Sequence, residues 1–308
     1  MIKKCVTIRI ATRKSPLAVI QAEFVKVLLE EGCTEGRFDV TTFSTLGDTR
    51  LNKPLAALGG KGLFTKEIDH AVFEGEADLA VHSLKDLPTE LPKGLILAGC
   101  PARESWRDVL ATSQSETLAS LPDGASIGCG SVRRRAQLLR LRPDFRFHDV
   151  RGNIHTRLVK SAKAGWAGVV MARSALDRLG FDVPRLDLGD HILPAAGQGA
   201  LGLVCRENDE TVKTAIQSIT HAATFEAVLC ERAFWRRIGA GCHAAAAVLA
   251  KQHGDGGRFS AAGRVLSADG TSCLEDNITF QHGDAVRAGA RLAESLLRKG
   301  AERVMAAL

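Results

Sequence analysis

The sequence contains no tyrosine, no Cys-x-x-Cys pair and no long apolar run, since runs such as Gly168 to Ala172 are far too short to cross a bilayer. No apolar segment of the kind found in a signal peptide follows Met1 to Lys4. These absences argue against a membrane protein and against an exported one. We therefore expect a cytoplasmic protein that does not interact with membranes.

Clusters of cysteine typical of metal sites are also missing. The eight cysteines are scattered, and a chain of 308 residues can bury a core without disulfide bonds. Cys5, Cys100, Cys205 and Cys230 lie in apolar segments, as small buried hydrophobic residues do. We expect free thiols in a reducing compartment and no metal site.

Aromatic residues that could stack on bases are scarce where positive charge is concentrated. The chain has 41 Lys and Arg against 35 Asp and Glu, a formal net charge of +6, and the excess lies largely between Arg133 and Arg157. Phe145 and Phe147 are the aromatic residues of that stretch. Small anionic ligands, or a solvated basic face, are therefore favoured over nucleic acid as the reason for the charge.

Strands that lead directly into helices organise most of the chain. Residues 6–11 alternate apolar and polar side chains as a strand does, and Ser15 and Pro16 follow as the N-cap and first residue of a helix that Gly32 ends. Further strands are predicted at 77–81, 125–129 and 145–150, and further helices at 66–74, at 132–142 and from about Ile154. Alternating strands and helices predict α/β domains with largely parallel sheets.

The last third has a different pattern, which predicts a small α+β domain. Its predicted elements are a helix over 222–238, strands at 245–250, 259–266 and 272–280, and a final helix over 284–308. Pro101 and the Pro- and Gly-containing stretch 182–202 mark two earlier boundaries. Because 308 residues exceed a typical single domain, we predict three domains.

Arginine occupies several turns where a strand leads into a helix. The residues concerned are Arg13, Arg133, Arg134, Arg151 and, one or two turns further along, Arg157. Ligands of open α/β sheets bind at that edge, where helix N-termini supply free N–H groups. Guanidinium groups pair bidentately with carboxylate or phosphate, so we infer a ligand with several anionic groups.

Asp86 adds a carboxylate to this basic edge. The segment from His82 to Asp86 follows a predicted strand, and it is either a solvent-facing turn or part of a catalytic site. An aspartate among cations stays ionised, which suits it to handle a proton or to stabilise a cation. Asp86 is therefore a candidate catalytic acid or base.

Two glycine-rich segments and one cysteine complete the candidates. Lys61 lies among glycines without the spacing of a phosphate loop, which favours a mobile lid with a basic contact. The segment 197–200, Gly-Gln-Gly-Ala, is either a hinge between domains or a plain tight turn. Gly239 and Gly241 leave the sulfur of Cys242 reachable, although no base that would activate it is identifiable.

Several motifs together resemble those of one family. They are Ile8 to Ala18, Gly59 to Phe64, Ala80 to Pro88, Ser131 to Arg134, Arg151 to Asn153, Pro194 to Ala200, and Glu231 to Phe234 leading to Cys242. On these motifs the chain resembles hydroxymethylbilane synthase, also called porphobilinogen deaminase, over nearly its whole length.

The resemblance implies two periplasmic-binding-protein-like (type II) α/β domains with a cleft between them, plus a small C-terminal α+β domain. The first domain would comprise residues 1–101 and 203–219, the second 102–202 and the third 222–308. It also implies a transferase of haem and porphyrin biosynthesis that joins four porphobilinogen molecules head to tail, releases ammonia at each step and then hydrolyses the linear tetrapyrrole free. We expect it to act as a monomer that binds no nucleic acid.

The same resemblance implies roles for individual residues. The primer would be a dipyrromethane cofactor bound by a thioether to Cys242, and Asp86 would assist loss of the substrate amino group and stabilise the cations formed. The acetate and propionate groups would be held by Arg13, Lys61, Ser83, Lys85, Ser131, Arg133, Arg134, Arg151, Arg157 and Arg178.

Three motifs depart from the family's usual pattern. The turn usually written Gly-Thr-Ser-Ser-Leu-Arg-Arg is Gly-Cys-Gly-Ser-Val-Arg-Arg over 128–134, which removes two hydroxyl groups that could bond cofactor carboxylates. Ser105 and Trp106 stand where Asp-Pro is common, and residues 240–245 differ around the cysteine. Two alternatives stay open: a non-catalytic carboxylate-binding module, which would bind reversibly without releasing ammonia, and a nucleic-acid-binding protein, whose affinity would fall steeply with salt.

Overall fold

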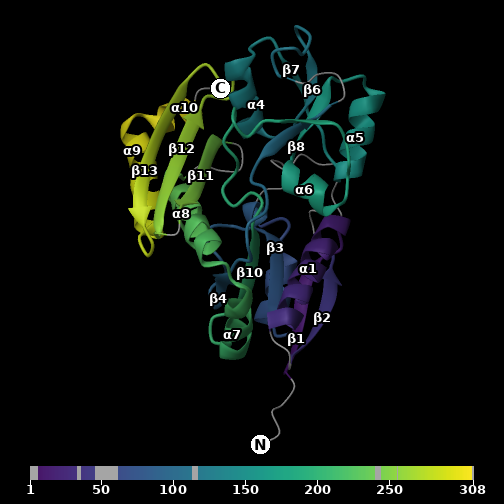
Figure 1. Ribbon diagram of the computed structural model, residues 1–308, viewed down its shortest axis with the longest axis vertical. Helices are drawn as coiled ribbons and strands as arrows, with labels where there is room; N and C mark the ends of the chain where they lie inside the picture. The colour runs from purple at the N-terminus through teal and green to yellow at the C-terminus, as the bar shows by residue number, and fades with distance from the viewer. Residues whose placement is uncertain are drawn as a thin grey trace, which may run out of the picture. The chain divides into compact units, whose positions relative to one another are not determined.

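The computed structural model describes residues 6–32, 36–45, 62–112, 117–239, 244–254 and 256–306. The chain divides into two compact units, one of residues 1–104 and 200–225 and the other of residues 105–199 and 226–308 (Figure 1). Each unit contains a five-stranded sheet with helices, and the second unit adds a three-stranded sheet. The predicted α/β class is confirmed, whereas the three-domain boundaries stay a prediction.

The sheet of the first unit has the strand order β2-β1-β3-β10-β4. Its strands are β1 (Val6–Arg13), β2 (Gly36–Phe43), β3 (Leu79–Ser83), β4 (Leu95–Gly99) and β10 (Leu201–Arg206). β1 is parallel to β2 and β3, but β10 runs antiparallel to both β3 and β4. The sheet is therefore mixed, but of its five strands only β10, from much later in the chain, points the opposite way, so the expectation of a largely parallel sheet is borne out by the other four.

Alternation along β1 places different helices on the two faces of this sheet. Ile8 and Ile10 share a buried core with residues of α1 (Pro16–Gly32) and α7 (Glu210–Ile219). Arg9 lies between them in the strand and points to the other face. There its Nη2 donates to the carbonyl of Gly75 at 2.8 Å, just after α3 (Lys66–Phe73).

The five-stranded sheet of the second unit has the order β7-β6-β8-β5-β9 and is also mixed. Its strands are β5 (Asp108–Ala111), β6 (Ser126–Gly128), β7 (Arg146–His148), β8 (Gly168–Ala172) and β9 (Arg185–Asp187). Its helices are α4 (Val132–Leu141), α5 (Ile154–Lys163) and α6 (Arg173–Arg178). Leu110 packs in one core with Leu138 of α4, and Val109 packs in another with Leu176 of α6, so both faces of β5 are buried.

The C-terminal part follows the predicted order closely. It consists of α8 (Ala222–Ile238), the antiparallel strands β11 (Ala245–His253), β12 (Arg258–Leu266) and β13 (Cys273–Gln281), then α9 (Ala285–Arg298) and α10 (Ala301–Ala306). The prediction of one final helix is wrong. Gly300 has φ +96, a left-handed conformation that ends α9 and that glycine adopts without strain.

Candidate functional site

The carboxyl ends of β1 and β3 bring three predicted site residues together. β1 ends at Arg13, the parallel strand β3 ends at Ser83, and the short 3-10 helix η2 (Leu84–Asp86) follows directly. Arg13, Ser83 and Asp86 line a single cavity of about 60 Å³. β3 runs two residues further than predicted, so Ser83 is held by the sheet rather than by a loop.

Two further residues, Phe64 and Gln21, line this cavity, and neither was predicted to have a role in the site. The ring of Phe64 lies against Arg13, whose Cζ is 4.3 Å from the ring centroid. Gln21 is buried in α1, and its Nε2 donates to Ser83 Oγ at 2.9 Å. A glutamine on the apolar face of a helix was the available signal for Gln21. Phe64 had none beyond its place after a glycine-rich segment.

A buried hydrogen bond between His82 and Asp69 supports the strand that leads into the cavity. Nε2 of His82 in β3 lies 2.9 Å from Oδ1 of Asp69 in α3, and each side chain is only 3% exposed. His82 immediately precedes Ser83, and it also lines the cavity. The pair therefore fixes α3 to the segment that positions Ser83 and Asp86.

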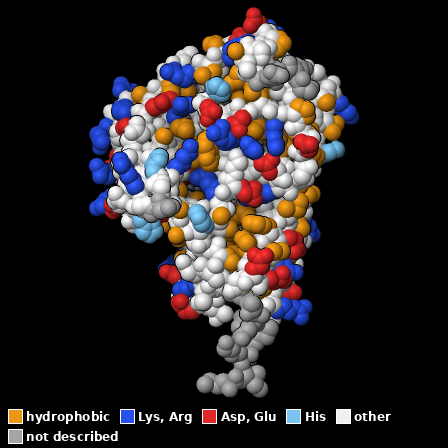
Figure 2. Space-filling model, viewed as in Figure 1, with side chains coloured by type: hydrophobic (Ala, Val, Ile, Leu, Met, Phe, Trp, Pro, Cys, Tyr) orange, Lys and Arg blue, Asp and Glu red, His pale blue; other side chains and the backbone are white. Residues whose placement is uncertain are grey.

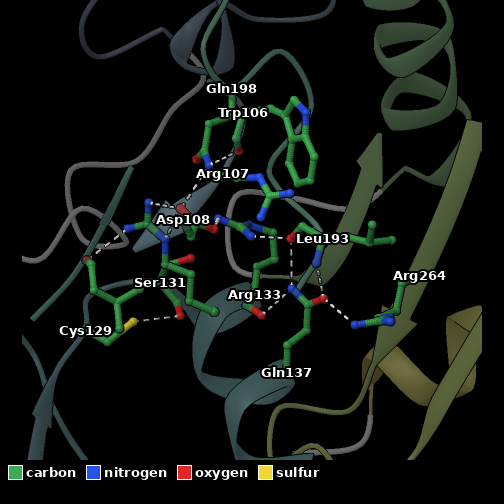
Figure 3. Close-up of polar contacts among 12 residues, drawn as sticks. Trp106, Arg107, Asp108, Cys129, Ser131, Arg133, Gln137, Leu193, Gln198 and Arg264 are labelled. Atoms are coloured by element: carbon green, nitrogen blue, oxygen red, sulfur yellow. Dashed lines mark hydrogen bonds and ion pairs between the residues drawn. The ribbon is translucent and has the colours of Figure 1, made fainter. Parts of the chain in front are cut away.

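In the second unit, Arg133 and Arg134 lie in the first turn of α4 and are both buried. Both guanidinium groups bind Asp108, with Arg133 Nη2 2.9 Å from Oδ2 and Arg134 Nη2 2.6 Å from Oδ1 (Figure 3). Burial lowers the pKa of Arg133, and the attraction of Asp108 opposes this shift. The predicted arginines thus lie next to each other and share a carboxylate.

Asp108 is a central residue of this cluster that the sequence analysis did not identify. It is the first residue of β5, its side chain is fully buried, and it also accepts a hydrogen bond from Gln198 Nε2 at 2.9 Å. In the sequence it is one more aspartate after an arginine. Only the fold shows that it faces two arginines from another element.

The other predicted carboxylate-binding residues of this unit lie at helix ends. Ser131 is the N-cap of α4, and Arg151 precedes α5, with its Nε 3.4 Å from Asp149 Oδ2. Arg157 Nε donates to the carbonyl of Gly152 at 2.8 Å. Arg178, the last residue of α6, donates from Nη2 to the carbonyl of Gly199 at 3.0 Å.

The altered turn before α4 has a steric explanation. Cys129 is fully buried, and its Sγ donates to the carbonyl of Ser131 at 3.6 Å. A Cβ at position 130 would lie 3.0 Å from the carbonyl oxygen of Val150, so Gly130 suits this close approach. The turn therefore packs without the two hydroxyl groups that the family pattern usually supplies.

Two predicted residues, Lys61 and Cys242, lie outside the described residues. Lys85 is described and lies exposed in η2, between Leu84, which is buried, and Asp86, which is exposed. Within the described ranges, no group of three or more His, Cys, Asp or Glu is placed to hold a metal ion. In the same part of the chain, no helix is long and apolar enough to span a membrane.

Comparison with known proteins accounts for both units. Residues 8–214 match the family model of the porphobilinogen deaminase dipyromethane cofactor binding domain, and residues 225–298 match that of its C-terminal domain. Porphobilinogen deaminase of Syntrophotalea carbinolica is 44% identical over 306 residues, 98% of this chain and 96% of its own. That of Geobacter sp. (strain M21) is 42% identical over 301 residues, 97% of this chain and 94% of its own.

Solved structures add only distant likenesses. The methionine-binding protein MetQ is 13% identical, covers 69% of this chain and 89% of its own, and has a TM-score of 0.43, which is too low to support an argument. The family models and the curated relatives suffice without it. The chain belongs to the porphobilinogen deaminase family.

Proposed function

We propose that the chain is a hydroxymethylbilane synthase, which condenses four porphobilinogen molecules head to tail on a dipyrromethane primer and then releases the linear tetrapyrrole by hydrolysis. The chain is a transferase of porphyrin biosynthesis through its family membership. The observation that carries the proposal to the residue level is the cavity of the first unit, which is lined by both a guanidinium (Arg13) and a carboxylate (Asp86).

Asp86 is the residue to which we assign the chemical step. Its carboxylate lies exposed at the end of η2 and lines the cavity beside Arg13. When the carbon–nitrogen bond of porphobilinogen breaks, the electron pair leaves with ammonia and a positive charge remains on the pyrrole. A carboxylate beside that charge stabilises it, while Arg13 binds a substrate carboxylate and so orients the ring.

The residues of the second unit suit a ligand that carries several carboxylates. When bound, the dipyrromethane cofactor supplies the electron-rich pyrrole carbon to which the first substrate is joined. Arg133 and Arg134 offer two guanidinium groups around one carboxylate, which is a donor set suited to further anions. We assign the remaining acetate and propionate groups to Ser131, Arg151, Arg157, Arg178, Lys61 and Lys85, and the thioether to Cys242.

We further propose a cytoplasmic monomer that binds no nucleic acid. Cys100, Cys129, Cys205, Cys230 and Cys273 are free thiols, as a reducing compartment would keep them. Part of the basic stretch is internal, since Arg133 and Arg134 are buried, and on the face drawn in Figure 2 Lys and Arg are interspersed with Asp and Glu. Neither feature favours a binding surface for a polyphosphate backbone.

Intact-protein mass spectrometry tests this function most directly. Protein made in a host that produces porphobilinogen should exceed the mass of its sequence by one dipyrromethane and should colour with Ehrlich's reagent in acid. Cys242→Ala should lack the added mass, whereas the control Cys273→Ala should retain it. An unmodified wild-type protein that releases no ammonia from porphobilinogen would contradict the proposal and favour a reversible carboxylate-binding module.

A further inference from the structure

The tight turn at residues 197–199 lies next to the place where the chain passes from the second unit to the first, and several hydrogen bonds hold it. Gly197 (φ +72) and Gly199 (φ +87) both have left-handed backbone conformations, which glycine adopts readily. They flank Gln198, whose side chain points inward and is completely buried. The backbone N–H of Gly197 donates to the buried carboxylate of Glu231 at 2.6 Å. The turn is therefore held in one conformation rather than left free.

Gln198 connects this turn to the segment by which the chain first enters the second unit. Its Nε2 donates to the carbonyl of Trp106 at 2.7 Å and to Asp108 Oδ1 at 2.9 Å. The chain enters this unit between residues 104 and 105, leaves it between residues 199 and 200 and returns to it between residues 225 and 226. One buried amide thus ties together the first two of these three crossing segments, within a few residues of each crossing (Figure 3).

The same connection reaches the arginines to which carboxylate binding is assigned. Asp108, which accepts from Gln198, also accepts from Arg133 and Arg134. Arg178 donates to the carbonyl of Gly199, on the turn itself. A ligand carboxylate that binds Arg133 or Arg134 competes with Asp108 for their N–H groups. That competition changes the hydrogen bonding of the Asp108 carboxylate, to which Gln198 donates.

We propose that Asp108 and Gln198 are positioning residues that couple carboxylate binding at Arg133 and Arg134 to two of the three segments joining the units. Ligand binding strengthens or reorients the Gln198 contacts, and it thereby restricts the backbone at 104–108 and 196–200. The inference rests on the proposed function, because it takes the ligand of these arginines to be a carboxylate of substrate or cofactor. It adds a link from the binding groups to the junctions, through the hydrogen bond between Asp108 and Gln198.

Hydrogen exchange of the full-length holoenzyme, with and without saturating porphobilinogen, tests the coupling. In wild type, peptides covering 104–108 and 196–200 should exchange about five- to tenfold more slowly with substrate, which is the lower range of allosteric couplings. Gln198→Met keeps the length of the side chain but removes the amide, and it should abolish this substrate-dependent protection while the intact mass still shows the cofactor.

Gln137→Met is the matched control. Gln137 is also a buried glutamine of the cluster, but its Nε2 donates to the carbonyls of Arg133 and Leu193 and does not contact Asp108. This variant should lose a similar amount of stability to urea and keep the protection. The coupling would be overturned if substrate slowed hydrogen exchange equally in Gln198→Met and in wild type. It would also be overturned if substrate did not slow exchange in a wild-type enzyme that turns over. A wild type with neither adduct nor ammonia release would instead contradict the proposed function.

Discussion

Single residues at strand ends were the most predictable part of the site. Arg13 ends a segment of alternating apolar and polar side chains, and Ser83 follows the apolar run Leu79 to Val81. Asp86 comes three residues after Ser83, and the structure places Arg13, Ser83 and Asp86 around one cavity. Gln21 and Asp108 were not assigned a role, because nothing local distinguishes a buried glutamine or aspartate from an exposed one. Their partners, Ser83 and Arg133, lie 62 and 25 residues away in the sequence.

Replacing Asp86 should separate catalysis from cofactor attachment. Asp86→Asn keeps the shape of the side chain but removes the negative charge that stabilises the substrate cation. We expect kcat to fall roughly 100-fold or more, with the intact mass still showing the dipyrromethane. Steady-state release of ammonia measures the first effect and mass spectrometry the second.

Glu90 provides the control for this substitution. It is an exposed carboxylate four residues further along and does not line the cavity. Glu90→Gln should leave kcat unchanged. Full activity in Asp86→Asn would remove Asp86 from the chemical step.

At the scale of strands and helices, local pattern predicted which elements exist but not how the strands pair. The helix α8 has the predicted bounds, and the three C-terminal strands occur in the predicted order. The place of β10 between β3 and β4 was not predictable from Leu201 to Arg206, because an apolar run carries no information about strand direction. Gly300 was read as part of a helix, although glycine is a common helix end.

Asp78, the residue before β3, links strands β1 and β10 of the first sheet and should make the stability of the protein depend on pH. It accepts hydrogen bonds from Arg9 in β1 and Arg206 in β10. Burial alone would raise the pKa of Asp78, but these hydrogen bonds outweigh burial and lower it from 3.8 to about 2. The stabilisation is complete above the pKa of the unfolded chain, about 3.9, and is lost as pH falls from there through about 2.

We expect Asp78→Asn to lower the free energy of unfolding at pH 7 by about 1–2 kcal/mol, a figure reduced for partial exposure to solvent. The difference from wild type should shrink between pH 4 and pH 2, as urea titrations at fixed pH would measure. Asp39→Asn is the control, because Asp39 and Arg37 form an exposed pair with side chains 45% and 71% exposed. A difference for Asp78→Asn that is the same at every pH would contradict this account.

At the scale of the whole molecule, the reactivity of the cysteines tests two things: which thiols the fold buries and which one carries the cofactor. Cys100, Cys129, Cys205 and Cys230 are buried in different parts of the described chain. Burial raises the pKa of Cys205 to about 11 and that of Cys230 to about 12, so these thiols carry almost no thiolate at neutral pH. In the folded protein, burial makes all four thiols inaccessible, and the raised pKa makes Cys205 and Cys230 unreactive as well.

Alkylation with iodoacetamide should exploit this difference between the folded and unfolded chain. In native holoenzyme these four thiols should remain unmodified over a period in which free cysteine reacts fully. In denaturant, the number of alkylated cysteines should be the eight of the sequence less one, because a thioether on Cys242 cannot react. Peptide mapping should then find the unalkylated cysteine at position 242 with the dipyrromethane attached. Eight alkylated cysteines in protein that still carries the added mass would place the cofactor on another kind of side chain. An unalkylated position other than 242 would move the thioether to another cysteine, and either result would require a different anchor for the growing chain.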